Sequence, residues 1–257
     1  MKIASQLAIL VLATFNLSAA TLYVSLVSTN PVAPYSAWTT AATNIQDAVD
    51  VAKKGDKVLV TNGVYAVGGK TNEWGSVESR VTITNSIRLE SVNGPLVTTV
   101  VGSTVLTNEF GEEVGREGGR CVYLGSNAVL SGFTLTNGNG SEWNGGGVFC
   151  ESSGLVTNCV ITDNHAGHGI PAGGGSGWRG LGGGAHGGTL YDCTLTGNFA
   201  KDAGGNTGSA GGGAYGSTLY NCTLTDNNAY GFSARGGGAS SCTLYNCTLT
   251  GNWANNP

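Results

Sequence analysis

The chain has 257 residues, of which 44 are glycine and only 11% are charged, and its formal net charge is −4. Because no basic stripe is present to hold phosphates, the composition excludes nucleic acid as a partner. Apolar residues return at fixed places between the glycines, which is typical of a folded chain and not of a disordered low-complexity tract.

The first residues have the organisation of a secretory signal peptide. Lys2 precedes an apolar segment at 7–15, and small residues follow at 18–20. Cleavage near Ala20 is expected to leave a mature domain of residues 21–257. No later stretch is apolar enough to span a bilayer. We therefore expect a protein that is secreted or held at the cell envelope or outer surface.

Residues 40–55 are expected to form an N-terminal cap, followed by irregular early coils at 56–117. Asn44 and Gly55 suit the beginning and the end of a short helix. Its apolar face would consist of Ile45, Ala48, Val49 and Ala52. Such a helix would cover the unpaired edge of the first coil of a solenoid, which would otherwise promote aggregation.

One sequence pattern is repeated four times within residues 118–257, and 121–138 is a weaker fifth copy. Each copy has a glycine triplet, two short apolar-alternating segments and a closing Asn, as in 218–227. Successive cysteines of the pattern are 34, 29 and 25 residues apart, whereas the spacing from triplet to cysteine is constant in the last three copies. A fixed unit joined by variable loops indicates a solenoid.

Within a copy, Leu and Cys alternate with Thr, a period of two that predicts short strands with one buried face. Asn or Asp recurs where a left-handed corner is expected, at Asn158, Asp192, Asn221 and Asn246. A second corner is expected at Asn164, Asn198, Asn227 and Asn252. The prediction is an all-β, right-handed parallel β-helix with three short strands per coil, in which equivalent residues stack on one another.

Four of the seven cysteines occupy equivalent positions in the copies: Cys159, Cys193, Cys222 and Cys247. Phe133 takes the same position in the weaker copy. Equivalent side chains on stacked strands stand roughly 4.8 Å apart and parallel, which does not suit a disulfide. We therefore expect a ladder of buried thiols, although an exported chain would ordinarily form disulfides.

The helix, the GDKVLVTNGVY and SVNGP segments and the GGG…TLYNCTLTGN repeats together resemble bacterial right-handed parallel β-helix proteins of the pectin-lyase-like superfamily. The repeats are also similar to those of polymorphic outer-membrane protein passengers and of surface-anchored bacterial proteins. The resemblance covers residues 40–252 and implies the fold. It leaves activity open, because enzymes, adhesins and stalks share these packing motifs.

Acid–base candidates in the repeats are sparse. A polysaccharide lyase needs a base and a cation beside a uronate, but Arg179 and Arg235 lie in glycine-rich loops without an acidic cluster. Asp163 and Asp226 share one column about 9.6 Å apart at strand spacing, a separation that an inverting glycosidase tolerates. Asp beside a corner Asn is also ordinary turn chemistry. The sequence therefore predicts no catalytic residue.

Metal-ligating residues are equally few. The histidines are His165, His168 and His186, and all three fall in loop or glycine-rich surroundings that lack the rigidity of a zinc site. We expect no metal and no cofactor.

Tyr191, Tyr220 and Tyr245 each follow an inward Leu, so alternation directs them outward in a stacked file. Such a file offers apolar surface and hydroxyls to a sugar chain or a protein; alternatively, each ring only shields neighbouring backbone. Trp143, Trp178 and Trp253 are weaker candidates of the same kind.

These patterns favour an exported structural or adhesive β-solenoid whose partner is an extracellular polysaccharide or a cell-surface protein. The alternative is a carbohydrate-active enzyme, either a polysaccharide lyase or a glycoside hydrolase. Because residues 252–257 end at a corner with no capping element, we expect the natural protein to continue, the alternative being an open end that meets a partner. The oligomeric state is not readable from the sequence.

Overall fold

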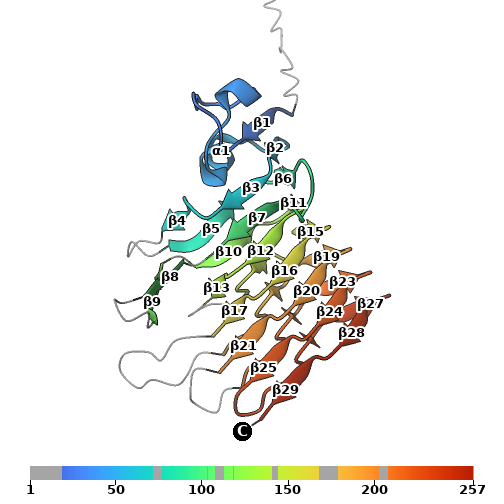
Figure 1. Ribbon diagram of the computed structural model, residues 1–257. Helices are drawn as coiled ribbons and strands as arrows, with labels where there is room; N and C mark the ends of the chain where they lie inside the picture. Colours follow the sequence, from blue (N-terminus) through green and yellow to red (C-terminus); the bar gives the residue numbers. More distant parts are fainter. Residues whose placement is uncertain are drawn as a thin grey trace, which may run out of the picture.

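A computed structural model describes residues 19–71, 77–102, 104–107, 113–117, 119–140, 144–167, 179–202 and 208–256. Short parallel strands stack coil upon coil into sheets that run along the molecule (Figure 1). The predicted right-handed parallel β-helix is confirmed. The regular coils carry the expected three strands and, in addition, a short fourth ladder that the sequence had not indicated.

Sheets A and B carry the Leu-containing strands of the repeats, paired in parallel throughout. Sheet A consists of β1 (Thr21–Val24), β2 (Lys57–Val60), β6 (Arg88–Ser91), β11 (Val129–Ser131), β15 (Leu155–Thr157), β19 (Thr189–Tyr191), β23 (Thr218–Tyr220) and β27 (Thr243–Tyr245). Sheet B consists of β3 (Gly63–Tyr65), β7 (Thr98–Val101), β12 (Thr134–Thr136), β16 (Val160–Thr162), β20 (Thr194–Thr196), β24 (Thr223–Thr225) and β28 (Thr248–Thr250).

Two further sheets complete the coil. Sheet C consists of β4 (Lys70–Thr71), β5 (Val77–Ile83), β10 (Arg120–Leu124), β14 (Val148–Cys150), β18 (Ala185–His186), β22 (Ala214–Tyr215) and β26 (Ala239–Ser240), with β4 antiparallel to β5. Sheet E is the fourth ladder, made of β13 (Asn139–Gly140), β17 (His165–Ala166), β21 (Phe199–Lys201), β25 (Asn228–Tyr230) and β29 (Trp253–Asn255). The strands β8 (Thr104–Thr107) and β9 (Glu113–Glu117) pair antiparallel as a separate hairpin, sheet D.

The predicted cap is a helix, α1 (Ile45–Val51), at the N-terminal end of the stack (Figure 1). The Asn44 side chain accepts a hydrogen bond from the Asp47 N–H, and the predicted apolar face is buried. The helix ends before Ala52, not at Gly55, which lies in the following turn with φ +92°. Before it come β1 and a short 3-10 helix, η1 (Trp38–Thr40). No helix within the described residues is long and apolar enough to cross a membrane.

The inward columns lie as the alternation predicts. Leu190 and Leu219 pair in sheet A, and Leu195 and Leu224 pair in sheet B, all fully buried. Phe133, Cys159, Cys193 and Cys222 are also buried, whereas Cys247 in the last described coil is half-buried. All seven cysteines are free thiols. Burial raises the pKa of both Cys121 and Cys150 to about 12, so these thiols are neutral.

The first predicted corner has left-handed backbone at Asn158, Asp192, Asn221 and Asn246, with φ between 50° and 53°. At the second corner the prediction is off by one residue. The left-handed positions there are Asp163, Gly197, Asp226 and Gly251, each of which precedes the predicted Asn. The Asn side chains themselves point inward, because the left-handed residue turns the chain and the next side chain enters the core.

Those inward asparagines form a continuous amide ladder. Asn164, Asn198 and Asn227 are completely buried, and each Nδ2 donates to the Oδ1 of the next Asn at 2.9–3.0 Å, ending on Asn252. In Asn198 the second Nδ2 proton goes to the Ile161 carbonyl at 2.8 Å. Its Oδ1 also accepts the Asn164 backbone N–H at 3.2 Å. Every polar atom of these side chains is therefore satisfied inside the core.

The glycine triplets are required by close contacts with the backbone of neighbouring coils and with the asparagine ladder. A Cβ on Gly184 would lie 2.7 Å from the Gly213 carbonyl oxygen and 3.0 Å from Nδ2 of Asn198, and one on Gly213 would lie 2.5 Å from the Gly238 carbonyl oxygen and 3.1 Å from Nδ2 of Asn227. The first glycine of each triplet has a positive φ, as in Gly182 at +67° and Gly211 at +65°. The triplets are thus a fixed part of the coil, and the variable joins lie before them.

Replacing Asn227 with Ala should be strongly destabilising. The change removes the side-chain donor to the Leu195 carbonyl and the acceptor for one Nδ2 proton of Asn198 in the core, a loss of about 2–4 kcal/mol of unfolding free energy. Urea unfolding measures it. The control is Asn221→Gly at the exposed corner, which keeps the left-handed backbone at φ 53° and should cost less than about 1 kcal/mol. Equal losses in the two variants would refute a structural role for the ladder.

Candidate functional site

The three tyrosines singled out by the sequence form an outward file on sheet A. Their rings stack with centroids 4.5 Å (Tyr191 to Tyr220) and 4.6 Å (Tyr220 to Tyr245) apart and planes within 9° of parallel. Tyr191 is 37% and Tyr245 is 50% exposed. The stacking covers the ring faces with one another, so the file presents ring edges and a row of hydroxyls to a ligand, and not the open faces that the sequence suggested.

A row of amides and one carboxylate borders the tyrosine file at the first corner. The Asn221 Nδ2 donates to Asp192 Oδ1 at 3.2 Å, and the Asn246 Nδ2 donates to Asn221 Oδ1 at 2.8 Å. All three side chains are exposed. Beyond this row, the outward positions of β20, β24 and β28 are all threonine. Polar, hydrogen-bonding columns therefore cover adjacent parts of sheets A and B.

Sheet C carries a second aromatic row, which the sequence did not reveal. Tyr123, Phe149, His186 and Tyr215 stack in order with centroids 5.6, 5.0 and 5.4 Å apart. The Arg120 guanidinium lies 5.4 Å from the Phe149 ring centroid. The Tyr123 hydroxyl donates to Glu151 Oε1 at 2.7 Å. This row gathers a base, an acid, a cation and phenols on one face.

His186 is the unusual member of this row. Burial, followed by the nearby positive charge of Arg120, lowers the pKa of His186 below its usual range, so the imidazole is neutral at neutral pH. Its Nδ1 has no hydrogen-bond partner among the described residues. The expectation of loop histidines is wrong for His186 and for His165, since both lie in strands, β18 and β17. His168 lies outside the described residues, as do Trp143 and Trp178.

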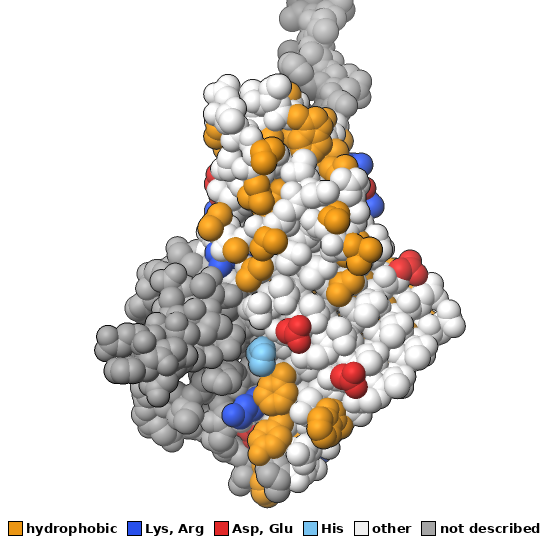
Figure 2. Space-filling model, in the orientation of Figure 1, with side chains coloured by type: hydrophobic (Ala, Val, Ile, Leu, Met, Phe, Trp, Pro, Cys, Tyr) orange, Lys and Arg blue, Asp and Glu red, His pale blue; other side chains and the backbone are white. Residues whose placement is uncertain are grey.

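Sheet E presents a looser aromatic group. His165 meets Phe199 edge to face at 5.7 Å, Phe199 lies 6.5 Å from Tyr230, and Trp253 on β29 is 61% exposed. Figure 2 shows hydrophobic side chains gathered where Figure 1 places β21, β25 and β29, beside a basic side chain. Trp253, the candidate tryptophan that falls within the described residues, thus lies on an exposed aromatic surface.

The acid–base candidates Asp163 and Asp226 have structural roles. Asp163 and Asp226 occupy left-handed corner positions with Gly197 between them, and the Thr162 hydroxyl donates to Asp163 Oδ2 at 2.9 Å. A Cβ on Gly197 would stand 2.8 Å from Asp163 Oδ1, so the glycine leaves room for that carboxylate. Within the described parts of the chain no group of three or more His, Cys, Asp or Glu side chains is placed to hold a metal.

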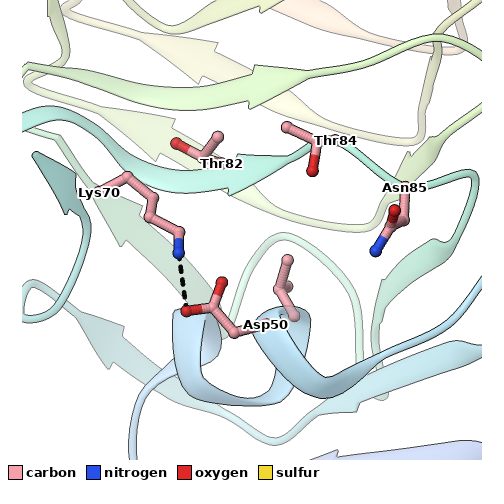
Figure 3. Close-up of a pocket in the computed structure, with 6 residues that line it drawn as sticks. Asp50, Lys70, Thr82, Thr84 and Asn85 are labelled. Carbon is pink, nitrogen blue, oxygen red and sulfur yellow. Dashed lines mark hydrogen bonds and ion pairs between the residues drawn. The ribbon is translucent and has the colours of Figure 1, made fainter. Parts of the chain in front are cut away.

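A cavity of about 300 Å³ lies between α1 and β5 (Figure 3). Val49, Asp50, Lys70, Thr82, Thr84 and Asn85 line it. The Lys70 ammonium and the Asp50 carboxylate are 2.9 Å apart and neutralise each other. The Gln46 side chain ties the helix to the strand, since its Oε1 accepts from the Thr82 N–H at 2.7 Å. These contacts fasten the cap to the first coils.

No family model matches the sequence, and the comparison with curated proteins gave no match. Among solved structures, a pectin methylesterase in complex with a hexasaccharide aligns with a TM-score of 0.48 and 13% identity over 91% of this chain and 66% of its own. Pectin methylesterase PemA from Erwinia chrysanthemi aligns with a TM-score of 0.43 and 12% identity over 93% of this chain and 67% of its own. The rice weevil pectin methylesterase aligns with a TM-score of 0.40 and 13% identity over 84% of this chain and 63% of its own. This chain spans just under two thirds of the length of the pectin methylesterase in complex with the hexasaccharide. The fold rests on the strand pairing itself, and the likeness carries nothing about activity.

The pKa of His186 gives a pH prediction for the sheet C row. Because the folded pKa is lowered, the unfolded chain takes up the proton more readily, and stability falls as pH drops below about 6.5 towards the folded pKa. His186→Phe keeps a ring in the stack and removes this titration. Urea unfolding at several pH values between 7.5 and 4.5 should therefore show a shallower acid loss in the variant. An unchanged pH dependence would contradict the burial of a neutral imidazole.

Proposed function

We propose that this chain is an exported, non-catalytic module that binds an extended polysaccharide along the tyrosine file of sheet A. The observation that carries the proposal is the in-register stack of Tyr191, Tyr220 and Tyr245, with a row of exposed amides beside it. Export, from the signal-peptide pattern at 1–20, would place this file outside the cell, where it meets extracellular polymers.

The geometry suits a repeating, hydroxyl-rich ligand. Each phenol both donates and accepts hydrogen bonds, and successive hydroxyls repeat at about the strand spacing of 4.8 Å. The rings are held by their neighbours, so little side-chain freedom is lost on binding. Single hydrogen bonds of about 1 kcal/mol are weak, but repeated contacts along one polymer add up. An adhesive module binds in this way, by many equivalent contacts along a surface.

One observation favours a second candidate, a carbohydrate-active enzyme. The sheet C row places a neutral imidazole, His186, in line with Tyr215 and near the Arg120 charge. A lyase needs such a base together with a cation beside a sugar carboxylate. Against this candidate, Arg120 is only 7% exposed and its Nη2 hydrogen bonds to the Asn144 carbonyl, so it is poorly placed for a substrate.

Changing the file to serine tests the proposed function. The wild type should be retarded in affinity gel electrophoresis by a neutral polysaccharide contained in the gel. Tyr191→Ser, Tyr220→Ser and Tyr245→Ser together should weaken this binding by roughly tenfold or more. The matched control is Thr194→Ser, Thr223→Ser and Thr248→Ser on sheet B, which should bind as the wild type does. Unchanged binding in the tyrosine variant, with both proteins folded by circular dichroism, would sink the proposal.

The same polysaccharides separate the two candidates. A binding module should generate no new reducing or unsaturated ends during prolonged incubation with acidic and neutral polymers. Time-dependent cleavage that is lost in His186→Gln would instead establish the enzyme and place its base on sheet C.

A further inference from the structure

Positive charge in the last three coils is confined to one corner. Between residues 179 and 256 the basic residues are Arg179, Lys201 and Arg235. Lys201 ends β21, and the bridges from Leu181 to Ala210 and from Ala210 to Arg235 place Arg179 and Arg235 on the segment that leads from sheet E into sheet C. Arg235 is in register with Leu181, two residues after Arg179, and lies two coils further along the axis, about 9.6 Å at strand spacing.

These three side chains are available to a ligand. Arg179 and Arg235 are exposed, and Lys201 is half-buried. Among the described residues neither Lys201 nor Arg235 forms an ion pair, and Arg179 makes one long hydrogen bond, 3.4 Å from its Nε to the Gly208 carbonyl. The upstream Arg80 differs, because it is buried and donates to the carbonyls of Val101 and Gly102.

Two of the three acidic residues in the same coils lie elsewhere. Asp192 is at the corner between sheets A and B, and Asp226 at the corner between sheets B and E. Asp202, beside Lys201, is buried, and its Oδ2 accepts from the Gly208 N–H at 3.2 Å. With Asp202 counted, the corner has three basic side chains against one buried carboxylate, a net charge of +2, although the whole chain carries a net charge of −4.

Aromatic rings complete this corner. Phe232, in the turn between β25 and Arg235, is 57% exposed, and Tyr230 pairs in register with Lys201. We define the E–C corner as Arg179, Lys201, Tyr230, Phe232 and Arg235. Arginine forks bind carboxylate and sulfate groups through paired, charge-assisted hydrogen bonds, and exposed rings pack against the carbon skeleton of a sugar.

We propose that the E–C corner is a second binding site, which takes an extended polysaccharide bearing sulfate or carboxylate groups. It lies on a different face from the tyrosine file and does not depend on it. Its charge is complementary to a polyanion, whereas the net negative charge of the rest of the chain repels one. With two faces of different preference, one solenoid would bridge a neutral and an anionic polymer.

Three polymers with one backbone test this site: dextran, carboxymethyl-dextran and dextran sulfate. Biolayer interferometry with the folded protein should show stronger binding to at least one of the anionic polymers than to dextran. Added salt should weaken the binding to the anionic polymer. Arg179→Gln, Lys201→Gln and Arg235→Gln together should weaken that binding about tenfold or more. The control, Lys53→Gln, Lys54→Gln and Lys57→Gln, removes the same charge at the N-terminal end and should bind as the wild type does.

The outcomes are distinguishable. A preference for dextran sulfate or for carboxymethyl-dextran identifies the anionic group, and either supports the site. Equal binding of all three polymers, or equal weakening in the two triple variants, overturns it. The variant with three serines in the tyrosine file should still bind the anionic polymer more strongly than dextran. This result therefore tests the E–C corner even if the tyrosine file binds no polysaccharide.

Discussion

The structure depends on one buried chain of hydrogen bonds. The asparagine ladder joins the coils of Asn164, Asn198, Asn227 and Asn252 through side-chain amides, of which the first three have no access to water and the last is half-buried. A shift of one coil against the next by a single residue would strand these groups in the core, and would also reverse which side chains face outward. The ladder therefore fixes the register, and the register creates every surface column.

Function, on this account, resides in columns and not in a pocket. Tyr191, Tyr220 and Tyr245 fall into one line because each occupies the same place in its coil. The same register produces the threonine columns of sheet B and the aromatic row of sheet C. A surface with one repeated group is suited to a polymer with a repeated unit. The cavity beside α1, in contrast, is lined by an ion pair and belongs to the fastening of the cap.

Much of the coil was predictable because the spacing within the repeated unit is constant. Equivalent positions of Cys193 and Cys222, or of Leu195 and Leu224, must stack in any solenoid, and the period of two assigns them to the core. The outward file of tyrosines follows from the same alternation. The role of the glycine triplets was less visible, because Gly184 and Gly213 are needed for contact with asparagines that follow them by fourteen residues. That contact is a property of the closed coil.

The remaining differences have similar causes. Alternation over three residues cannot decide whether Asp226 or Asn227 takes the left-handed position, since both residue types tolerate it. His186 follows the glycine triplet and looked like part of a loop, but that segment pairs with β14 and β22 as a strand. The sheet C row contains three residue types over four coils, Tyr, Phe, His and Tyr, so no single repeated residue marked it. The basic corner likewise joins Lys201 of β21 to Arg179 and Arg235, which lie in segments of unequal length between the strands.

Side-chain amide hydrogen exchange, followed by NMR, tests the central claim most directly. The account predicts that the Nδ2 protons of Asn198 and Asn227 exchange only on global unfolding, whereas those of the exposed Asn221 and Asn246 exchange rapidly. Rapid exchange at Asn198 and Asn227 in the folded protein would contradict a ladder that holds the coils in register.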